Sequence, residues 1–191
     1  SIGKDMATSS VVTALYPCAD GIWIGTPTAL MRIGRHGGRP EELVRLPVVK
    51  TICMNEDGCI LAGTDNGIYR YSPAGGECTR VNMNIAWSSF RDRDGNLWFA
   101  TDNGLLVLRQ GSPISGLDNL PPSETALYTH IMLDSRGRLW LGSTQGLVLM
   151  PEYAAKGAGS IARRFSVEDD SSHIPHNKIR NITEDGDGNI W

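Results

Sequence analysis

The sequence predicts an all-β fold, a segment of a β-propeller built from four-stranded blades. Three observations lead to this prediction. A phrase of the form Asp-Gly-x-x-Trp recurs along the 191 residues at intervals close to forty. Glycine-containing turn signals divide each copy into short apolar runs. No segment keeps the i, i+3, i+4, i+7 apolar spacing of an amphipathic helix between its Gly and Pro breaks.

The recurring phrase is present in five copies. They read DGIWIGTPTALMRI from Asp20, DGCILAGTDNGIYRY from Asp57, DGNLWFATDNGLLVL from Asp94, RGRLWLGSTQGLVLM from Arg136 and DGNIW from Asp187. Successive copies are 38, 37, 42 and 51 residues apart at the tryptophan position, a period typical of a propeller blade and too long for a leucine-rich repeat. We therefore expect a partial propeller over 1–191, about four blades plus the start of a fifth, at 10–46, 47–84, 85–123, 124–175 and the incomplete 176–191.

Turn chemistry predicts four strands in each copy. Asp-Gly or Arg-Gly makes one tight turn, and Asn-Gly at 66–67 and 103–104 predicts a second hairpin, because glycine tolerates a positive φ. The runs between the turns, such as LWFAT, are apolar on both faces, as in covered strands. A weaker strand such as CTRVNM follows the second hairpin. Another strand precedes the first turn, at 11–16, 48–54, 85–90, 128–133 and 178–183.

A small residue lies two positions after the tryptophan of three copies. Alternate residues of a strand share a face, so Trp23, Trp98 and Trp140 lie beside Gly25, Ala100 and Gly142. We expect the indole of one blade to fill the hollow that the small residue of its neighbour leaves. The repeated column would then be packing between blades rather than a site, and its members are Trp23, Leu61, Trp98, Trp140 and Trp191.

Composition argues against several partners and cofactors. A formal net charge of −3 with scattered Lys and Arg gives no basic surface for nucleic acid or an anionic membrane, and any membrane span would lie outside this chain. The four cysteines lack zinc-ligand spacing, and the DRDGN turn lacks the Gly and Glu positions of a calcium loop, so neither a metal nor another cofactor is expected. A four-residue turn at NEDG would pair Met54 with Cys59, which favours buried thiols over a Cys53–Cys59 disulfide.

Sequence motifs give little support for catalysis. No nucleophile elbow, metal-binding His pair or phosphate loop is present. The paired carboxylates Asp169 and Asp170 lie in a polar stretch that is typical of a surface loop. A propeller lyase or hydrolase is therefore the weaker alternative.

A binding role has better candidates in the first strand of each blade, which lines the axis of a propeller. The strand-end residues Asn55, Asp92, Asp134 and Asp185 locate equivalent positions five residues earlier. These positions are polar or aromatic, and we predict that they contact a ligand together with the neighbouring His130: Lys50, Trp87, Thr129, His130 and Arg180. Trp87 is the strongest candidate because indole faces stack on sugar rings, although simple packing of Trp87 stays an alternative.

The phrase DGNLWFATDNGL, the lead-in IPHNKIRNITEDGDGNIW at 174–191 and the period together resemble the two-component regulator propeller repeat. The resemblance covers roughly residues 10–191 and implies part of a seven-bladed ring. It also implies the periplasmic sensor region of a hybrid two-component histidine kinase, anchored in the inner membrane, non-catalytic and dimeric, which detects oligosaccharides and passes the signal across the membrane. An interaction or dimerisation scaffold without its own ligand site is the main alternative. Ala29, Leu61 and Arg136 depart from the Gly, Trp and Asp that the other copies have at these positions, which is consistent with repeats that serve packing.

Overall fold

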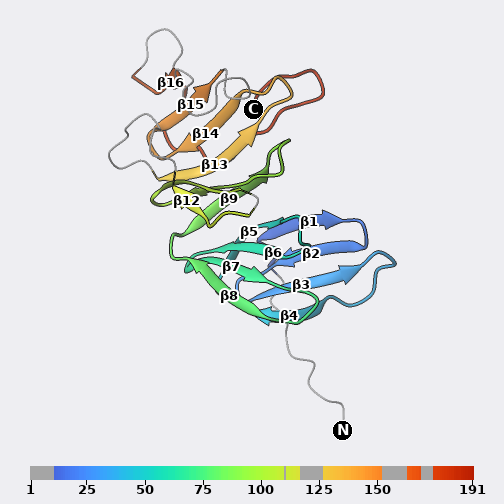
Figure 1. Ribbon diagram of the computed structural model, residues 1–191. Helices are drawn as coiled ribbons and strands as arrows, with labels where there is room; N and C mark the ends of the chain where they lie inside the picture. The colour runs from blue at the N-terminus through green and yellow to red at the C-terminus, as the bar shows by residue number, and fades with distance from the viewer. Residues whose placement is uncertain (1–10, 110, 117–126, 152–162, 169–173) are drawn as a thin grey trace.

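Four antiparallel sheets of four strands each follow one another along the chain (Figure 1). The computed structural model describes residues 11–109, 111–116, 127–151, 163–168 and 174–191. Within these ranges every regular element is a strand, and no helix could cross a bilayer. In each sheet, consecutive strands pair as neighbours, so every sheet is an up-and-down meander.

The four sheets are the blades of the propeller. Blade 1 comprises β1 (Ala14–Cys18), β2 (Gly21–Gly25), β3 (Ala29–Gly34) and β4 (Glu41–Arg45). Blade 2 comprises β5 (Val49–Met54), β6 (Ile60–Thr64), β7 (Gly67–Tyr71) and β8 (Cys78–Asn82). Blade 3 comprises β9 (Ala86–Arg91), β10 (Leu97–Thr101), β11 (Gly104–Leu108) and β12 (Ser115–Gly116). Blade 4 comprises β13 (Tyr128–Leu133), β14 (Leu139–Ser143), β15 (Gly146–Met150) and β16 (Arg163–Phe165).

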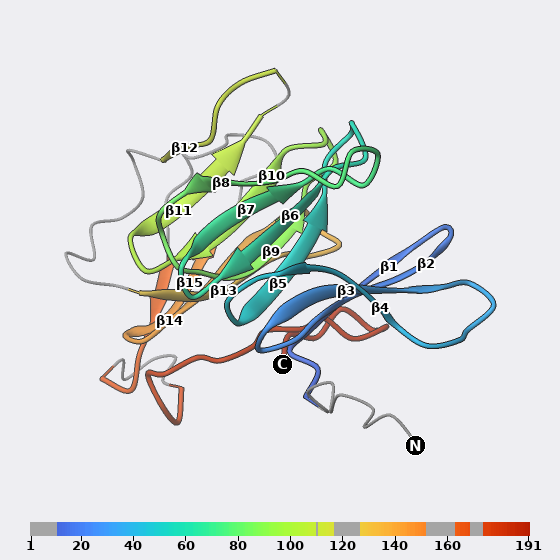
Figure 2. The same cartoon turned by 90° about the horizontal axis from the view of Figure 1, so that it is seen from below.

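The first strands of successive blades lie side by side at the hub. Strand β5 contacts β1 and β9, and β9 contacts β13. The Thr51 and Ser89 hydroxyls, on β5 and β9, are 2.6 Å apart and share a hydrogen bond between blades. Figure 2 shows the strands from below, with β5, β9 and β13, the first strands of blades 2, 3 and 4, next to one another. This arrangement confirms the predicted all-β propeller of four-stranded blades.

Acidic or amide side chains organise the turns between first and second strands. Asp92 Oδ1 accepts hydrogen bonds from the backbone N–H groups of Asp94 (3.0 Å) and Asn96 (2.8 Å), and Gly95 adopts a φ of 83°. Asp134 and Asp185 form the same turn. The side chain at the strand end therefore accepts hydrogen bonds from backbone N–H groups that the turn leaves unpaired.

The turn at Asn55 corrects the expected pairing of the cysteines. Met54 pairs with Ile60 rather than with Cys59, and Cys53 pairs with Leu61, because Cys59 still belongs to the turn and donates its backbone N–H to Asn55 Oδ1 at 2.9 Å. All four cysteines are free. Burial, moderated by a hydrogen bond with Ser89, raises the pKa of Cys53 to about 12.

The Asn-Gly signals also act differently from the prediction. Both hairpins form, but the two-residue turns are Asp65–Asn66 and Asp102–Asn103, and each glycine is the first residue of the following strand. Gly67 has a φ of 111°, and a Cβ built on it would lie 2.3 Å from the Asn82 carbonyl oxygen. Glycine is therefore required at this position by the close approach of β8 as well as by backbone conformation.

The predicted tryptophan column lies between blades over most of its length. Trp23 packs with Ile60 of blade 2, Leu61 with Phe99 of blade 3, and Trp98 with Leu141 of blade 4. The exposed fractions are 3% for Trp23, 0% for Leu61, 3% for Trp98 and 7% for Trp140. Trp191 is 74% exposed, contrary to expectation, because no sheet within the described ranges covers it.

The hollows beside the tryptophans are filled by the hub rather than by an indole. A Cβ on Gly25 would lie 2.7 Å from Val49 Cγ1, and one on Gly142 would lie 2.8 Å from Ile179 Cγ2. Val49 is the first residue of β5, in the next blade. The small residues thus let the first strand of the next blade approach closely, and the expectation of an indole in the hollow is wrong.

The start of the fifth unit is less regular than expected. Residues 178–183 form no strand, and the unit is held by an isolated bridge between Glu184 and Ile190. The Thr183 and Trp191 backbones exchange two hydrogen bonds, at 3.0 and 2.9 Å. Ile179 donates its N–H to the Ser143 carbonyl at 2.9 Å, which attaches this unit to blade 4.

Candidate functional site

Three of the predicted ligand residues occupy one structural position, a β-bulge near the start of the first strand. In blade 2, Val49 pairs with Thr64 and Thr51 with Gly63, so Lys50 is an extra residue. Trp87 and Thr129 are the extra residues of β9 and β13. A bulge re-aims its side chain away from the ladder and is frequent beside binding sites.

Lys50 and Trp87 are in direct contact across two blades. The Lys50 ammonium nitrogen lies 4.3 Å from the centroid of the Trp87 ring, a cation–π contact. Both residues are half-buried. The Trp87 Nε1 atom is buried and has no hydrogen-bond partner among the described residues. The structure therefore brings together two residues that are 37 positions apart and leaves the Trp87 N–H without a hydrogen-bond acceptor among the described residues.

Thr129, at the same position of β13, makes a hydrogen bond within the fold. Its hydroxyl donates to the Ile179 carbonyl at 2.5 Å, next to Arg180, which is exposed. Thr13 holds the equivalent position before blade 1 and donates to the Val49 carbonyl at 2.5 Å. Thr13 could not be found by counting back from an acidic or amide strand-end residue, because Cys18 occupies that position in blade 1. Threonine at this position thus connects β1 to β5 and β13 to the segment at Ile179, whereas Lys50 and Trp87 occupy it in blades 2 and 3.

His130 follows the bulge of β13 and is half-buried. Burial lowers the pKa of His130, so its imidazole is neutral at pH 7 and carries one N–H donor and one acceptor. Its Nδ1 atom is buried and lacks a hydrogen-bond partner within the described ranges. We use the name hub set for the five predicted residues Lys50, Trp87, Thr129, His130 and Arg180.

A second arrangement, which sequence analysis missed, joins the turn aspartate to the tryptophan six residues later. The indole N–H of Trp98 donates to Asp92, that of Trp140 to Asp134 and that of Trp191 to Asp185, each at 2.8 Å. We call this pair the Asp–Trp clasp. The signal was present in the sequence as an Asp-x₅-Trp spacing that occurs three times, with the aspartate two residues before the Asp-Gly or Arg-Gly of the repeated phrase.

The Asp134 clasp is the most buried of the three. The Asp134 side chain is fully buried and also accepts from Arg138 Nε at 2.5 Å. Burial alone would raise the pKa of Asp134, but hydrogen bonds from Trp140 and Arg138 outweigh it and hold this pKa below its usual range. At Asp185, hydrogen bonds from Trp191 and Asn189 lower the pKa. Both carboxylates are therefore charged acceptors at neutral pH.

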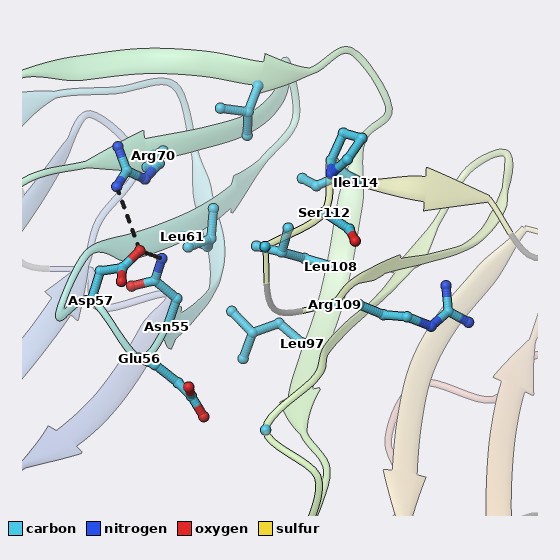
Figure 3. A pocket seen from close by; sticks show the side chains of 14 residues that line it. Asn55, Glu56, Asp57, Leu61, Arg70, Leu97, Leu108, Arg109, Ser112 and Ile114 are labelled. Atoms are coloured by element: carbon cyan, nitrogen blue, oxygen red, sulfur yellow. Dashed lines mark hydrogen bonds and ion pairs between the residues drawn. The ribbon is translucent and has the colours of Figure 1, made fainter.

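A pocket of about 630 Å³ lies between blades 2 and 3 (Figure 3). Its wall includes Leu61, Leu97 and Leu108, and its rim includes Asn55, Asp57 and Arg70. Figure 3 shows the leucines on the two facing blades, whereas the Arg109 side chain points away from them. This volume is in the range of small-molecule sites.

Within the described ranges no three His, Cys, Asp or Glu side chains are grouped so that they could hold a metal ion. The Asp169–Asp170 pair lies outside the described residues.

Comparisons with known proteins agree with the fold. The family model of the two component regulator propeller matches residues 81–103, a stretch that contains Trp87 and the Asp92–Trp98 clasp. No curated protein matches the chain by sequence.

Solved structures resemble the chain over nearly its whole length. The extracellular domains of two candidate hybrid two component systems from B. thetaiotaomicron are 19% and 17% identical, with TM-scores of 0.57 and 0.54. The matches cover 98% and 96% of this chain but only 34% and 32% of those domains. An inactive virginiamycin B lyase from Staphylococcus aureus, solved with quinupristin, is 17% identical with a TM-score of 0.67, covering 97% of this chain and 64% of that one.

At these identities the likeness shows the fold alone, and the chain spans about a third of the length of the two extracellular domains. The family match adds the type of repeat. The chain is thus a segment of a β-propeller, and it carries a two-component regulator propeller repeat at residues 81–103.

Proposed function

We propose that this chain is part of the extracytoplasmic sensor region of a hybrid two-component histidine kinase and that it is non-catalytic. The repeat at 81–103 and the shared fold of the B. thetaiotaomicron extracellular domains support this assignment. Such a region lies on the periplasmic side of the inner membrane and is anchored by a span outside this chain.

We place oligosaccharide contacts at the hub set. The observation that carries this proposal is the pair of buried polar atoms without hydrogen-bond partners, Trp87 Nε1 and His130 Nδ1, on the neighbouring strands β9 and β13. An unpaired buried polar group is costly and is retained where something else satisfies it. Sugar hydroxyls both donate and accept, and the Trp87 ring offers an apolar face beside them.

A ligand transmits a signal only if it binds one arrangement of the blades better than another. A tenfold shift requires about 1.4 kcal/mol of differential binding, which is about one or two hydrogen bonds at about 1 kcal/mol each. The two unpaired atoms of the hub set are sufficient for such a shift if the ligand reaches both in only one arrangement. The hub strands are joined by the Thr51–Ser89 and Thr129–Ile179 hydrogen bonds, so a ligand there acts on the blade junctions.

The test is calorimetric titration of the chain with a panel of oligosaccharides. Trp87→Phe keeps an aromatic ring and deletes the N–H, and it should weaken binding about fivefold, the equivalent of one hydrogen bond. Trp23→Phe is the matched control, because Trp23 also has a buried Nε1 without a partner but lies in the core between blades 1 and 2. Equal effects of the two substitutions, or no saccharide binding to the wild type, would contradict the assignment.

One observation favours the alternative of an interaction scaffold. Blade 1 carries exposed apolar side chains on its first two strands and the residues before them, namely Val11 (56%), Val12 (54%), Leu15 (62%) and Ile22 (39%). Such a face suits a contact with another sheet, including a self-association as a dimer. Light scattering of wild type and Leu15→Glu distinguishes the two functions, since a scaffold requires assembly and a hub ligand site does not.

A propeller lyase or hydrolase is the weaker alternative. Its support is the fold shared with virginiamycin B lyase. Release of smaller products when the chain is incubated with the same oligosaccharide panel would favour it over a sensor.

A further inference from the structure

The pocket between blades 2 and 3 occupies the place where other blades hold an indole. Leu61 stands in the tryptophan column, and its neighbours in the pocket are the equivalents of residues that contact an indole elsewhere. Asn55 lies six residues before Leu61, as Asp134 does before Trp140. Arg70 pairs with Leu61 across β6 and β7, as Arg32 pairs with Trp23 across β2 and β3.

Blade 1 provides the filled counterpart of this pocket. There the Arg32 guanidinium lies 5.5 Å from the centroid of the Trp23 ring and is paired with the carboxylate of Asp20. In blade 2, Arg70 is 4.0 Å from Asp57, which begins the same repeated phrase, and its cross-strand partner is Leu61 (Figure 3). The Arg–carboxylate pair is therefore kept, while the aromatic ring is replaced by the smaller Leu61, which is buried beneath the pocket.

The polarity of the rim differs from that of an Asp–Trp clasp. In the clasps, one carboxylate oxygen accepts backbone N–H groups and the second accepts the indole N–H. Asn55 Oδ1 accepts the Cys59 N–H, and this contact orients the amide so that Nδ2, a donor, takes the place of the second oxygen. Nδ2 lies 3.4 Å from Asp57 Oδ2, a long contact that leaves it able to donate to a ligand.

The apolar wall of the pocket is aliphatic and comes from both blades. Leu61 and Leu97 are almost fully buried, and Leu108 is half-buried. Beneath the rim, Glu56 forms an ion pair with Arg91 of blade 3 at 2.8 Å, so its charge is already compensated. The pocket thus combines an aliphatic wall, a guanidinium that can lie over a ring, and one outward amide donor.

We propose that this pocket binds a small, flat aromatic compound with a hydrogen-bond acceptor on its ring edge. The ring lies against the half-buried Leu108 and Ile114, above the buried Leu61 and beneath Arg70, and its acceptor receives the Asn55 Nδ2–H. Guanidinium over an aromatic face is favourable when partly desolvated, and the acceptor distinguishes this ligand from the indole N–H that the clasps bind. The proposal is independent of saccharide binding at the hub set.

Quinoline and indole are the probes, because they are similar in size and differ in the edge atom, an acceptor nitrogen in one and an N–H donor in the other. Ligand-observed NMR and calorimetry at neutral pH should show that the wild-type chain binds quinoline at least fivefold more tightly than indole. Asn55→Asp should reverse this preference, since it restores the acceptor of the clasps. The aspartate already occupies this turn position in three other units, so the fold tolerates it.

The double substitution Asn55→Asp with Leu61→Trp fills the pocket with the chain's own indole. It should reduce quinoline affinity more than tenfold and raise the thermal midpoint of unfolding. Trp87→Phe, at the hub set, should leave quinoline binding unchanged, which separates this pocket from the proposed sensor site. Failure of the wild type to bind quinoline, equal affinity for both probes, or unchanged quinoline binding in the filled variant would each overturn the proposal.

Discussion

The Asp134–Trp140 clasp makes the sharpest prediction about stability. Blade 2 carries Asn55 and Leu61 at the two equivalent positions, so aspartate and tryptophan are absent together. We expect Asp134→Asn and Trp140→Leu to be coupled. The single substitutions break the clasp from either side, and the double substitution reproduces the pair that blade 2 already uses.

The expected magnitudes follow from the contacts. Asp134→Asn turns an acceptor of the Trp140 N–H (2.8 Å) and Arg138 Nε (2.5 Å) into a donor that faces two donors. Two charge-assisted hydrogen bonds contribute about 1.5–3 kcal/mol each, and Arg138 can partly rehydrate, so the loss should be about 3 kcal/mol. Trp140→Leu should cost about 2–3 kcal/mol from lost packing. The double variant should be more stable than the sum of the two losses by about 1–2 kcal/mol, because no indole N–H then faces the amide.

Urea unfolding followed by far-ultraviolet circular dichroism measures this double-mutant cycle, since tryptophan fluorescence would change with the substitution itself. The slope with urea should be equal in all four proteins, so that changes in midpoint report stability. Asp94→Asn is the control, because this exposed residue begins the repeated phrase but lies outside the clasp, and it should change stability by less than about 0.5 kcal/mol. Losses that add within about 0.5 kcal/mol would refute the clasp as an energetic unit.

Three further predictions concern pH, packing and thiol reactivity. The folded chain lowers the pKa of Asp134, so the charged Asp134 carboxylate stabilises the fold above its ordinary pKa of 3.8. This stabilisation is lost as the pH falls through the lower pKa of the folded state. The difference in urea midpoint between wild type and Asp134→Asn should therefore narrow below about pH 4. Gly142→Ala should cost about 1–3 kcal/mol by the same measurement, because its Cβ would lie 2.8 Å from Ile179 Cγ2, whereas Gly186→Ala, with no atom within 4 Å, should be nearly neutral. In the folded chain Cys53, with its pKa raised to about 12, should resist alkylation at pH 8, and rapid labelling of Cys53 would contradict its burial.

Much of the fold could be predicted because its signals are local. The repeated phrase, the glycine turns and the apolar strand pairs each depend on residues within one copy, and turn chemistry works over three or four residues. The errors arose where a neighbouring strand intervenes. Gly67 is required by the Asn82 carbonyl, and the hollow at Gly25 receives Val49 from the next blade. Neither contact could be inferred from spacing, because the partners are 15 and 24 residues away.

The sequence predicted which strand position the candidate binding residues share, but it did not predict which residues contact one another. Counting back from the strand ends placed Lys50, Trp87 and Thr129 at one position, and the structure identifies that position as a β-bulge. The Lys50–Trp87 contact and the Thr129 hydrogen bond to Ile179 depend on which blades are neighbours. The binding role of the hub set stays a prediction.

The sequence by itself determined the period, the strand-turn alternation and the column of large residues, because each repeat carries its own hairpin chemistry and its own apolar faces. The tertiary structure alone decided what lies between repeats: the clasps at Trp98, Trp140 and Trp191, the hub residues that enter the hollows at Gly25 and Gly142, and the pocket between blades 2 and 3. The physical reason is that a blade buries its faces only against its neighbours, so the shape and polarity of every junction depend on two repeats at once.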